Sequence, residues 1–450
     1  MKIEIIKTAS LGNRGYLIHD GSVAIAVDVQ RDYERWVAKA SELGVDITYV
    51  LETHMHNDYV TGGYILSQEV EAQYVIPADS GQSFKATEAY DGDNFTIGRL
   101  SLSAIRTPGH TLNHTTYVIT DGVSSAAFTG GGVLYGTVGR PDLISNDLTE
   151  KLTASQYDSA KKISRVLSDT TQIFPTHGFG SFCSSAPGSG ANASTLADEK
   201  RTNLVYTTPT KQAFINTIIS GLNAYPRYYA QMGKMNQSGP AEMKLKPVEK
   251  LLPNMLKTLL AHDEWVVDIR NRKVYAAGHP AGAAGFELAD SFSSYVGWII
   301  PWGDAITLVG DNSEDLITAQ TQLGRIGMDS FVKYSTNDTV SYAAAGPKRT
   351  YPVKQFRELA ISIQDEPFIL DVRTPAEYKV EHITSSYNIP LYDLTAQIDD
   401  LPKDKNIWVH CASGYRASIG ASLIDRTGRS VILIDDDFNV TSKLGLTNRE

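Results

Sequence analysis

One pattern occurs twice in the second half of this sequence and constrains its fold more than any other feature. Residues 264–283 read EWVVDIRNRKVYAAGHPAGA, and residues 367–386 read PFILDVRTPAEYKVEHITSS. Each stretch has an apolar run typical of a buried strand, then Asp-aliphatic-Arg, then a histidine. The hydrophobic patterns that follow also match. We therefore expect two copies of one small α/β domain, each of roughly a hundred residues.

The rest of the chain predicts one larger domain before the repeat. A length of 450 residues is more than one core usually holds. The N-terminal part alternates short strand-like runs with helical segments, and a proline-punctuated stretch at 226–256 indicates a boundary. The segment KRTYPVKQF, 348–356, is the expected joint between the copies. The predicted domains are residues 1–255, 256–347 and 348–450.

Charge and composition narrow the possible partners. The chain has 51 acidic and 41 basic residues and a net charge of −10, without a long basic run, so nucleic acid is not an expected partner. No stretch is apolar and long enough to predict a membrane span or a signal peptide. Cys183 and Cys411 are the only cysteines, which excludes a disulfide framework and favours the cytoplasm. A symmetric homo-oligomer is expected.

The stretch VHCASGYRAS, 409–418, predicts a reactive cysteine. An apolar strand runs into Cys411, and a helix-compatible run follows Arg416. A cysteine at a helix N-terminus faces exposed N–H groups and the positive end of the helix dipole. With the charge of Arg416 nearby, both favour the reactive thiolate. The expected substrate-binding loop between these two residues comprises Ala412, Ser413, Gly414 and Tyr415. The alternative is a buried structural cysteine at a strand end.

The repeat and this loop together resemble the rhodanese family, whose domain is a small doubly wound α/β unit. The resemblance implies that Cys411 carries a persulfide sulfur between a sulfane donor and a nucleophilic acceptor, with Arg416 holding the donor. The first copy has Gly310 at the position of Cys411, followed by Asp311, Glu314 and Asp315. We expect this copy to lack sulfur transfer and to have a structural role.

A cluster of histidines predicts a metal-site ancestry for the first domain. In ETHMHNDYVTGG, 52–63, His54 and His56 are two apart after a strand, so both can point the same way. His110 and His177 each follow a later strand-like run, and histidines on strand-end loops can converge on one ion. The remaining candidate pocket residues are Asp58 and Cys183.

The order THMHND, TPGHT, FTGG, GRPDL and PTHGFGSFC resembles the metallo-β-lactamase superfamily, and within it the persulfide dioxygenase branch. This resemblance implies an αββα sandwich, so the expected fold is α/β: that sandwich followed by two rhodanese-like domains. It also implies two missing ligands. Tyr59 replaces a histidine, and Gly131 replaces the aspartate that binds iron in that branch.

Without that carboxylate, a two-zinc hydrolase is not expected. His54, His56 and His110 could still form a three-histidine site, so the expected cofactor is one mononuclear ion, iron or zinc, or none. The predicted function is a sulfurtransferase of persulfide metabolism acting through Cys411. The first domain then either binds and presents a thiol persulfide without catalysis, or remains a dioxygenase with a rebuilt metal site. The expected small-molecule partners are a low-molecular-weight thiol persulfide, thiosulfate and sulfite.

Overall fold

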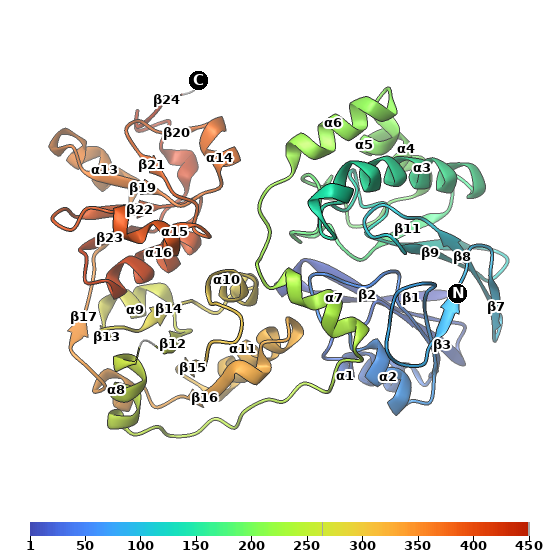
Figure 1. The fold of residues 1–450 in the computed structure, drawn as a ribbon, viewed down its shortest axis with the longest axis horizontal. Helices are drawn as coiled ribbons and strands as arrows, with labels where there is room; N and C mark the ends of the chain where they lie inside the picture. The colour runs from blue at the N-terminus through green and yellow to red at the C-terminus, as the bar shows by residue number, and fades with distance from the viewer. Residues whose placement is uncertain (263, 449–450) are drawn as a thin grey trace. The chain divides into compact units, whose positions relative to one another are not determined.

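The computed structural model describes residues 1–262 and 264–448, and the chain forms two compact units. The first unit comprises Met1–Lys244 with Gly324–Gly327, and the second comprises Leu245–Leu323 with Met328–Glu450 (Figure 1). The second unit contains one parallel sheet on each side of residue 348. The finer division into three domains at 256 and 348 stays a prediction.

The first unit contains two sheets. The six-stranded sheet has its strands in chain order: β1 (Lys2–Thr8), β2 (Asn13–His19), β3 (Val23–Val27), β4 (Asp46–Leu51), β5 (Gln73–Pro77) and β6 (Thr87–Ala89). The five-stranded sheet has the order β11-β10-β9-β8-β7, formed by β7 (Asn94–Ile97), β8 (Leu100–Arg106), β9 (Thr115–Thr120), β10 (Ser125–Gly130) and β11 (Gln172–Pro175).

Alternating side chains place the core between these two sheets. In β8, Leu100, Leu102 and Ala104 are buried while Ser101 is exposed, as expected for a strand with one face on the core. The β8 residues share a cluster with Leu51 and Val75 of the other sheet. Apolar side chains of the two sheets therefore hold the sandwich together by burial from water.

Helices cover both outer faces of the sandwich (Figure 1). Trp36 and Leu66, from α1 (Glu34–Leu43) and α2 (Gly63–Glu69), pack on the six-stranded sheet. Ile163 and Phe214, from α3 (Thr149–Val166) and α6 (Lys211–Gly221), pack on the five-stranded sheet. The other helices of this unit are α4 (Leu196–Thr202), α5 (Leu204–Thr207) and α7 (Tyr229–Gln237). The predicted αββα sandwich is confirmed.

The second unit contains two parallel sheets of matching strand order. The first, β14-β12-β15-β16, is formed by β12 (Trp265–Asp268), β14 (Ala284–Gly285), β15 (Ile306–Val309) and β16 (Val332–Thr336). The second, β21-β19-β22-β23-β18, is formed by β18 (Val353–Lys354), β19 (Phe368–Asp371), β21 (Tyr387–Asn388), β22 (Ile407–His410) and β23 (Val431–Ile434).

Helices lie around these sheets, and two short antiparallel pairs complete the unit. The helices are α8 (Pro253–Ala261), α9 (Arg272–Ala277), α10 (Phe292–Ile299), α11 (Ser313–Arg325), α12 (Thr339–Ala343), α13 (Phe356–Ser362), α14 (Pro375–Val380), α15 (Leu394–Gln397) and α16 (Tyr415–Arg426). The pairs are β13 (His279–Pro280) with β17 (Lys348–Arg349), and β20 (His382–Ile383) with β24 (Thr447–Asn448). We call residues 256–347 the first copy and residues 348–450 the second copy.

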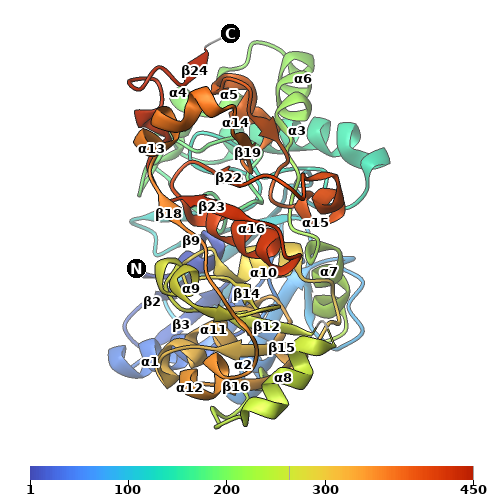
Figure 2. The same cartoon turned by 90° about the vertical axis from the view of Figure 1, so that its left-hand side faces the viewer.

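Helix α16 belongs to the second copy but packs on both sheets (Figure 2). The Ser422 hydroxyl donates to the Gly285 carbonyl at 3.2 Å, and the Arg426 Nε donates to the Gly282 carbonyl at 2.8 Å. Because α16 starts at the end of the Cys411 loop, contacts with the first copy help to fix the direction in which that loop points.

Candidate active sites in the two units

Loops after the strands of the first unit bring five buried histidines together. His54 and His56 follow β4, His110 follows β8, His114 precedes β9, and His177 follows β11. The ring centre of His54 lies within 5.3 Å of the ring centres of the other four. Imidazoles this close, in a site shielded from water, point to a ligand or to an ordered proton network.

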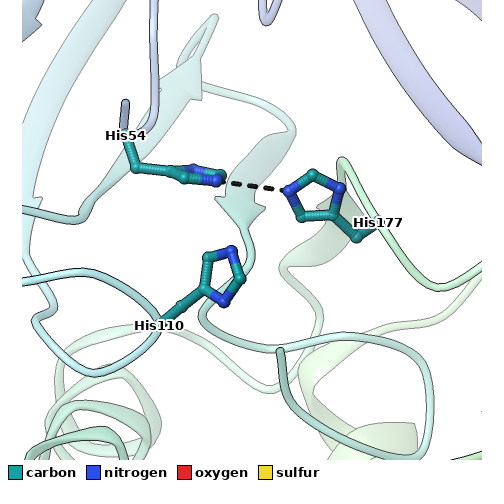
Figure 3. Close-up of side chains that lie close together, drawn as sticks. All are labelled: His54, His110 and His177. Carbon is teal, nitrogen blue, oxygen red and sulfur yellow. Dashed lines mark hydrogen bonds between the residues drawn. The ribbon is translucent and has the colours of Figure 1, made fainter. Parts of the chain in front are cut away.

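Three of these histidines turn their Nε2 atoms toward one another. The Nε2 atoms of His54 and His177 are 3.2 Å apart, and His110 lies beside them (Figure 3). One ligand nitrogen from each of the three lies within 4.8 Å of the other two. Of the expected residues, the structure thus brings His177 together with His54 and His110. This group could hold a metal ion.

His56 is directed to a different set of partners. Its Nε2 lies 3.0 Å from the Glu52 carboxylate and 3.3 Å from the Asp28 carboxylate. Burial acts to lower the pKa of His56, but the charge of Asp28 and the hydrogen bonds to both carboxylates outweigh it and raise the pKa to about 10. A charged His56 does not offer Nε2 to a metal in this arrangement. Its expected role as a ligand beside His54 and His110 stays a prediction.

Two further groups of side chains could also hold a metal ion. They are His56, Asp58 and His177, and Asp28, Glu52 and His56. Asp58 accepts from the Asn13 amide at 2.8 Å and lies 3.2 Å from His177 Nδ1. Burial acts to raise the pKa of Asp58, but His177 outweighs it and holds that pKa below its ordinary value. Asp58 is therefore an ionised carboxylate directly behind His177.

Gly131, where the family resemblance implies an aspartate, is closely packed against a neighbour. A Cβ atom at Gly131 would lie 2.2 Å from Cδ2 and 2.7 Å from Nε2 of His110. The His110 ring occupies the space that a side chain at 131 would need. Tyr59, at the other missing position, is fully buried and stacks on His56 with ring centres 4.3 Å apart. Neither position is an empty vacancy in the fold.

His114 was not singled out from the sequence, although it stands four residues after His110. Its Nε2 accepts from the Gly131 N–H at 3.1 Å, and its Nδ1 bonds the Thr107 hydroxyl at 2.9 Å. Burial lowers the pKa of His114 to about 4. This neutral imidazole orders the turn that contains Gly131. The spacing of four residues between His110 and His114 was the only feature of the sequence that could have indicated a role for His114.

Cys183 is fully buried beside the cluster. Its thiol lies 3.7 Å from the Tyr229 hydroxyl. Burial, with the nearby charge of Asp58, raises the pKa of the thiol well above its ordinary value. The geometry favours a packed, protonated thiol.

The Cys411 loop of the second unit connects β22 to α16 with four residues. Cys411 is buried at the end of the strand, and Gly414 has φ of 88°. A Cβ atom at Gly414 would lie 2.1 Å from the Asp435 carboxylate, so both the backbone angle and the close approach require glycine. Ser413 is exposed and Ala412 is half-buried. The loop is a tight turn at the N-terminus of a helix, as predicted.

Arg416 is fixed in a two-point ion pair. Its two terminal nitrogens each lie 2.7 Å from an oxygen of Glu377. Glu377 in turn accepts from the backbone and hydroxyl of Thr374, at the start of α14. Burial acts to raise the pKa of Glu377, but Arg416 outweighs it and lowers the pKa to about 2. The sequence analysis did not identify Glu377, which holds the guanidinium charge in place.

The first copy supplies aromatic side chains next to this loop. The Tyr415 hydroxyl donates to the Glu287 carbonyl at 2.9 Å, and the Tyr295 ring centre is 5.9 Å from that of Tyr415. Burial raises the pKa of Tyr295 to about 12, so its hydroxyl stays protonated at neutral pH.

The corresponding loop of the first copy, Gly310–Asn312, is one residue shorter. A Cβ atom at Gly310 would lie 3.1 Å from Cγ1 of Ile269 and 3.2 Å from Cγ of Leu316. A side chain at 310 would therefore be crowded by apolar groups, which would have to shift by a few tenths of an ångström. In the part of the chain that the structure describes, no helix is long and apolar enough to cross a membrane.

Comparisons with known proteins agree with the description of the histidine-containing first unit and of the Cys411 domain. Residues 355–443 match the model of the family described as Rhodanese-like domain. The chain is 33% identical over 112 residues to a hydroxyacylglutathione hydrolase of Rhodopseudomonas palustris (strain BisB5), over 24% of this chain and 44% of that protein. It is 30% identical over 192 residues to the mitochondrial persulfide dioxygenase ETHE1 of Bos taurus, over 42% of this chain and 69% of that protein.

Among solved structures, the metallo-beta-lactamase from Staphylococcus aureus subsp. aureus COL superposes with a TM-score of 0.66 at 26% identity. The superposition covers 74% of this chain and 98% of that chain, a larger share of this chain than its first unit occupies. The chain spans less than half of the hydrolase and about two thirds of the dioxygenase. It belongs to the family of the ETHE1 persulfide dioxygenases on a metallo-β-lactamase fold, and carries a rhodanese-like domain at its C-terminal end.

Proposed function

We propose that the chain is a sulfurtransferase of persulfide metabolism that moves sulfane sulfur through a persulfide on Cys411. The observation that carries this proposal is the loop itself: a cysteine at a helix N-terminus, a glycine-dependent turn, and a guanidinium held by Glu377. Loop N–H groups, the helix dipole and Arg416 together favour an anion at this position. The match of residues 355–443 to the rhodanese-like family supports the same chemistry.

The transfer occurs in two displacements. The Cys411 thiolate attacks the outer sulfur of thiosulfate or of a thiol persulfide. The sulfur–sulfur bond of the donor breaks, sulfite or a thiolate leaves with its electron pair, and Cys411 keeps the outer sulfur as a persulfide. A thiol, sulfite or cyanide then attacks that sulfur, and the Cys411 thiolate is released. In this proposal Arg416 stabilises the anionic donor, and backbone N–H groups at the start of α16 favour the negative charge on the sulfur.

The first unit supports a second candidate role, binding a small thiol persulfide beside the histidine cluster. A pocket of about 280 Å³ is lined by His177, Phe179, Asn192 and neighbouring glycines. The Arg14 guanidinium lies 3.6 Å from the centre of the Phe179 ring and donates to Asn192 at 3.0 Å, which places a cation behind the pocket wall. A small anionic ligand fits this lining. Oxygen uptake with a thiol persulfide would separate oxidation from binding alone.

The Cys411→Ser variant tests the sulfurtransferase proposal. Thiocyanate formation from thiosulfate and cyanide should fall by about a thousandfold or more, because the hydroxyl cannot carry the sulfur. Mass spectrometry of the unmodified protein after thiosulfate treatment should show one added sulfur on the peptide that contains Cys411. Cys183→Ser is the matched control and should keep the activity. A Cys411→Ser protein that retains most of the transfer rate would contradict the proposal.

A further inference from the structure

The hydrogen bonds behind three histidines determine which of their nitrogens carry protons. His110 Nδ1 faces the Arg140 carbonyl at 2.8 Å, which can only accept. His177 Nδ1 faces the Asn13 side-chain oxygen at 3.0 Å and the Asp58 carboxylate at 3.2 Å, which are also acceptors. Both Nδ1 atoms must therefore donate, and a ring with one proton then leaves its Nε2 as a bare acceptor.

The same reasoning applies to His54. Its Nδ1 lies 2.9 Å from the Thr53 hydroxyl, and that hydroxyl donates its own hydrogen to Asp28 at 2.8 Å. His54 Nδ1 must then donate to Thr53, so His54 Nε2 is also bare. Each ring is oriented by a hydrogen bond at Nδ1, which is the usual way in which proteins fix a metal-ligating histidine.

Three bare nitrogens now point into one buried space. His54 and His177 present their lone pairs to each other at 3.2 Å, and His110 Nε2 has no hydrogen-bond partner among the described residues. A proton shared between His54 and His177 would remove the repulsion between them, but it would leave His110 unsatisfied. A cation bound by all three nitrogens satisfies every one of them.

The spacing fits a metal ion of known size. Two nitrogens bound to a tetrahedral zinc ion, each about 2.0–2.1 Å from the metal, lie about 3.3 Å from each other. The observed separation of His54 Nε2 and His177 Nε2 is 3.2 Å. The Asp58 carboxylate lies 3.2 Å from His177 Nδ1, on the side of the ring away from the site. Carboxylate–histidine pairs of this kind raise the basicity of the ligating nitrogen.

Gly131 is part of this arrangement. A side chain there would collide with the His110 ring, and a Cβ at Gly139 on the other side would lie 2.7 Å from His110 Nδ1. The ring sits between two glycines, and its position depends on both. With glycine at 131, the ligand atoms that converge here all belong to imidazoles.

We propose that His54, His110 and His177 form a mononuclear Zn²⁺ site, and that Gly131 is the residue that admits His110 to it. Three histidines with an open fourth position are a recurrent zinc ligand set, whereas mononuclear iron of this kind usually requires a carboxylate. Imidazole donors also bind Zn²⁺ more tightly than Fe²⁺ in general. The bound ion would supply a Lewis acid beside the pocket that His177 lines.

The test uses the full chain after metal removal by a chelator. Calorimetric titration should show one Zn²⁺ per chain, bound at least about tenfold more tightly than Fe²⁺ added without oxygen. Co²⁺ should give the intense visible absorption of a four-coordinate site, and His177→Gln should weaken Zn²⁺ binding by about a hundredfold or more. Absence of Zn²⁺ binding, preference for Fe²⁺, or unchanged affinity in His177→Gln would each overturn the proposal.

The two adjacent glycines provide a matched pair of variants. Gly131→Ala should lose Zn²⁺ binding because the new methyl group displaces His110. Gly132→Ala should retain it, since a Cβ there lies 3.0 Å from the edge of His114 and touches none of the three ligands. If His177→Gln or Gly131→Ala fails to fold, the unmodified protein still decides the question. Zn²⁺ should raise its thermal unfolding temperature, and no rise would count against the site.

Discussion

The two copies of the repeat share their supporting contacts and differ in the residues that could do chemistry. Asp268 pairs with Arg270 at 2.7 Å in the first copy, and Asp371 pairs with Arg373 at 2.6 Å in the second. In both copies the same arginine also donates to the carbonyl of the residue eight positions after it. Arg270 donates to Gly278, and Arg373 donates to Glu381. These pairs lock the chain at the end of the equivalent strands β12 and β19.

A second contact is also repeated. Tyr275 stacks on His279 with ring centres 3.9 Å apart, and Tyr378 stacks on His382 at 4.1 Å. In each copy the histidine Nδ1 bonds the carbonyl of the stacked tyrosine. These contacts give His279 and His382 the same supporting position in the two copies.

The chemical residues, in contrast, differ together. Counting along the matched elements, Gly310 stands for Cys411, Val274 for Glu377 and Glu314 for Arg416. The first copy therefore lacks the thiol and both members of the ion pair. Either charge alone would be unfavourable, because Glu377 or Arg416 without the other would be a partly buried, unpaired charge. The comparison teaches that the scaffold of this domain does not depend on its active site.

The largest expected effect tests the shared scaffold. Asp268→Asn and Asp371→Asn should each lower the free energy of unfolding by about 3 kcal/mol, because each leaves a buried arginine without its counter-charge. Denaturant unfolding of the full chain, followed by fluorescence, measures both. Similar losses in the two variants would support equivalent roles. A large loss in only one of them would break the comparison.

The next effect tests the residue that is present only in the second copy. Glu377→Gln should raise the KM for thiosulfate about tenfold, because Arg416 loses the anion that positions it. Steady-state kinetics measure this change. Gln at 377 keeps the shape of the side chain, so an unchanged KM would show that Arg416 does not need this partner.

The stability of the Glu377→Gln variant should also depend on pH differently from that of the unmodified chain. The pKa of Glu377 lies at about 2 in the folded chain against an ordinary value of 4.5. A carboxyl group with a lowered folded pKa stabilises the fold fully above the ordinary value and loses that contribution as the pH falls toward 2. Glu377→Gln should therefore lose less stability than the unmodified chain between pH 5 and pH 2, as measured by unfolding at each pH.

The smallest expected effect concerns the first copy, where adding a cysteine should not create sulfur-transfer activity. Gly310→Cys in a Cys411→Ser background should show no sulfur transfer, because Ile269 and Leu316 crowd position 310 and Glu314 stands where the second copy has Arg416. The thiosulfate and cyanide assay measures it, with the unmodified chain as the positive control. Any transfer well above the Cys411→Ser background would show that the first copy lacks only its thiol.

Much of this architecture could be predicted from the sequence because it depends on local patterns. Strand alternation, the repeated Asp-aliphatic-Arg stretch and the glycine-dependent Cys411 loop each lie within a few consecutive residues. The histidine cluster is different, because its members come from loops far apart in the chain. His54 and His56 follow the same strand, yet only His54 forms a group with both His110 and His177.

The reason for this outcome lies in residues that spacing does not connect. Glu52 and Asp28 attract His56, and the absence of a side chain at Gly131 leaves room for His110. Glu377 was missed for the same reason, since it lies on α14 while Arg416 lies on α16. Long-range charge pairing and available volume determined these positions, and neither is encoded in a short motif.

The hydrogen bond from Tyr415 to Glu287 affects whether the second copy can be produced as a separate fragment. Tyr415, which follows the turn of the Cys411 loop, is held by a hydrogen bond to the first copy. Arg272 of that copy also binds Asp435, which packs against Gly414. The second copy is thus not a portable module. A fragment that begins after residue 347 would contain Cys411, Arg416 and Glu377 but would lack Glu287 and Arg272, whose contacts support the loop.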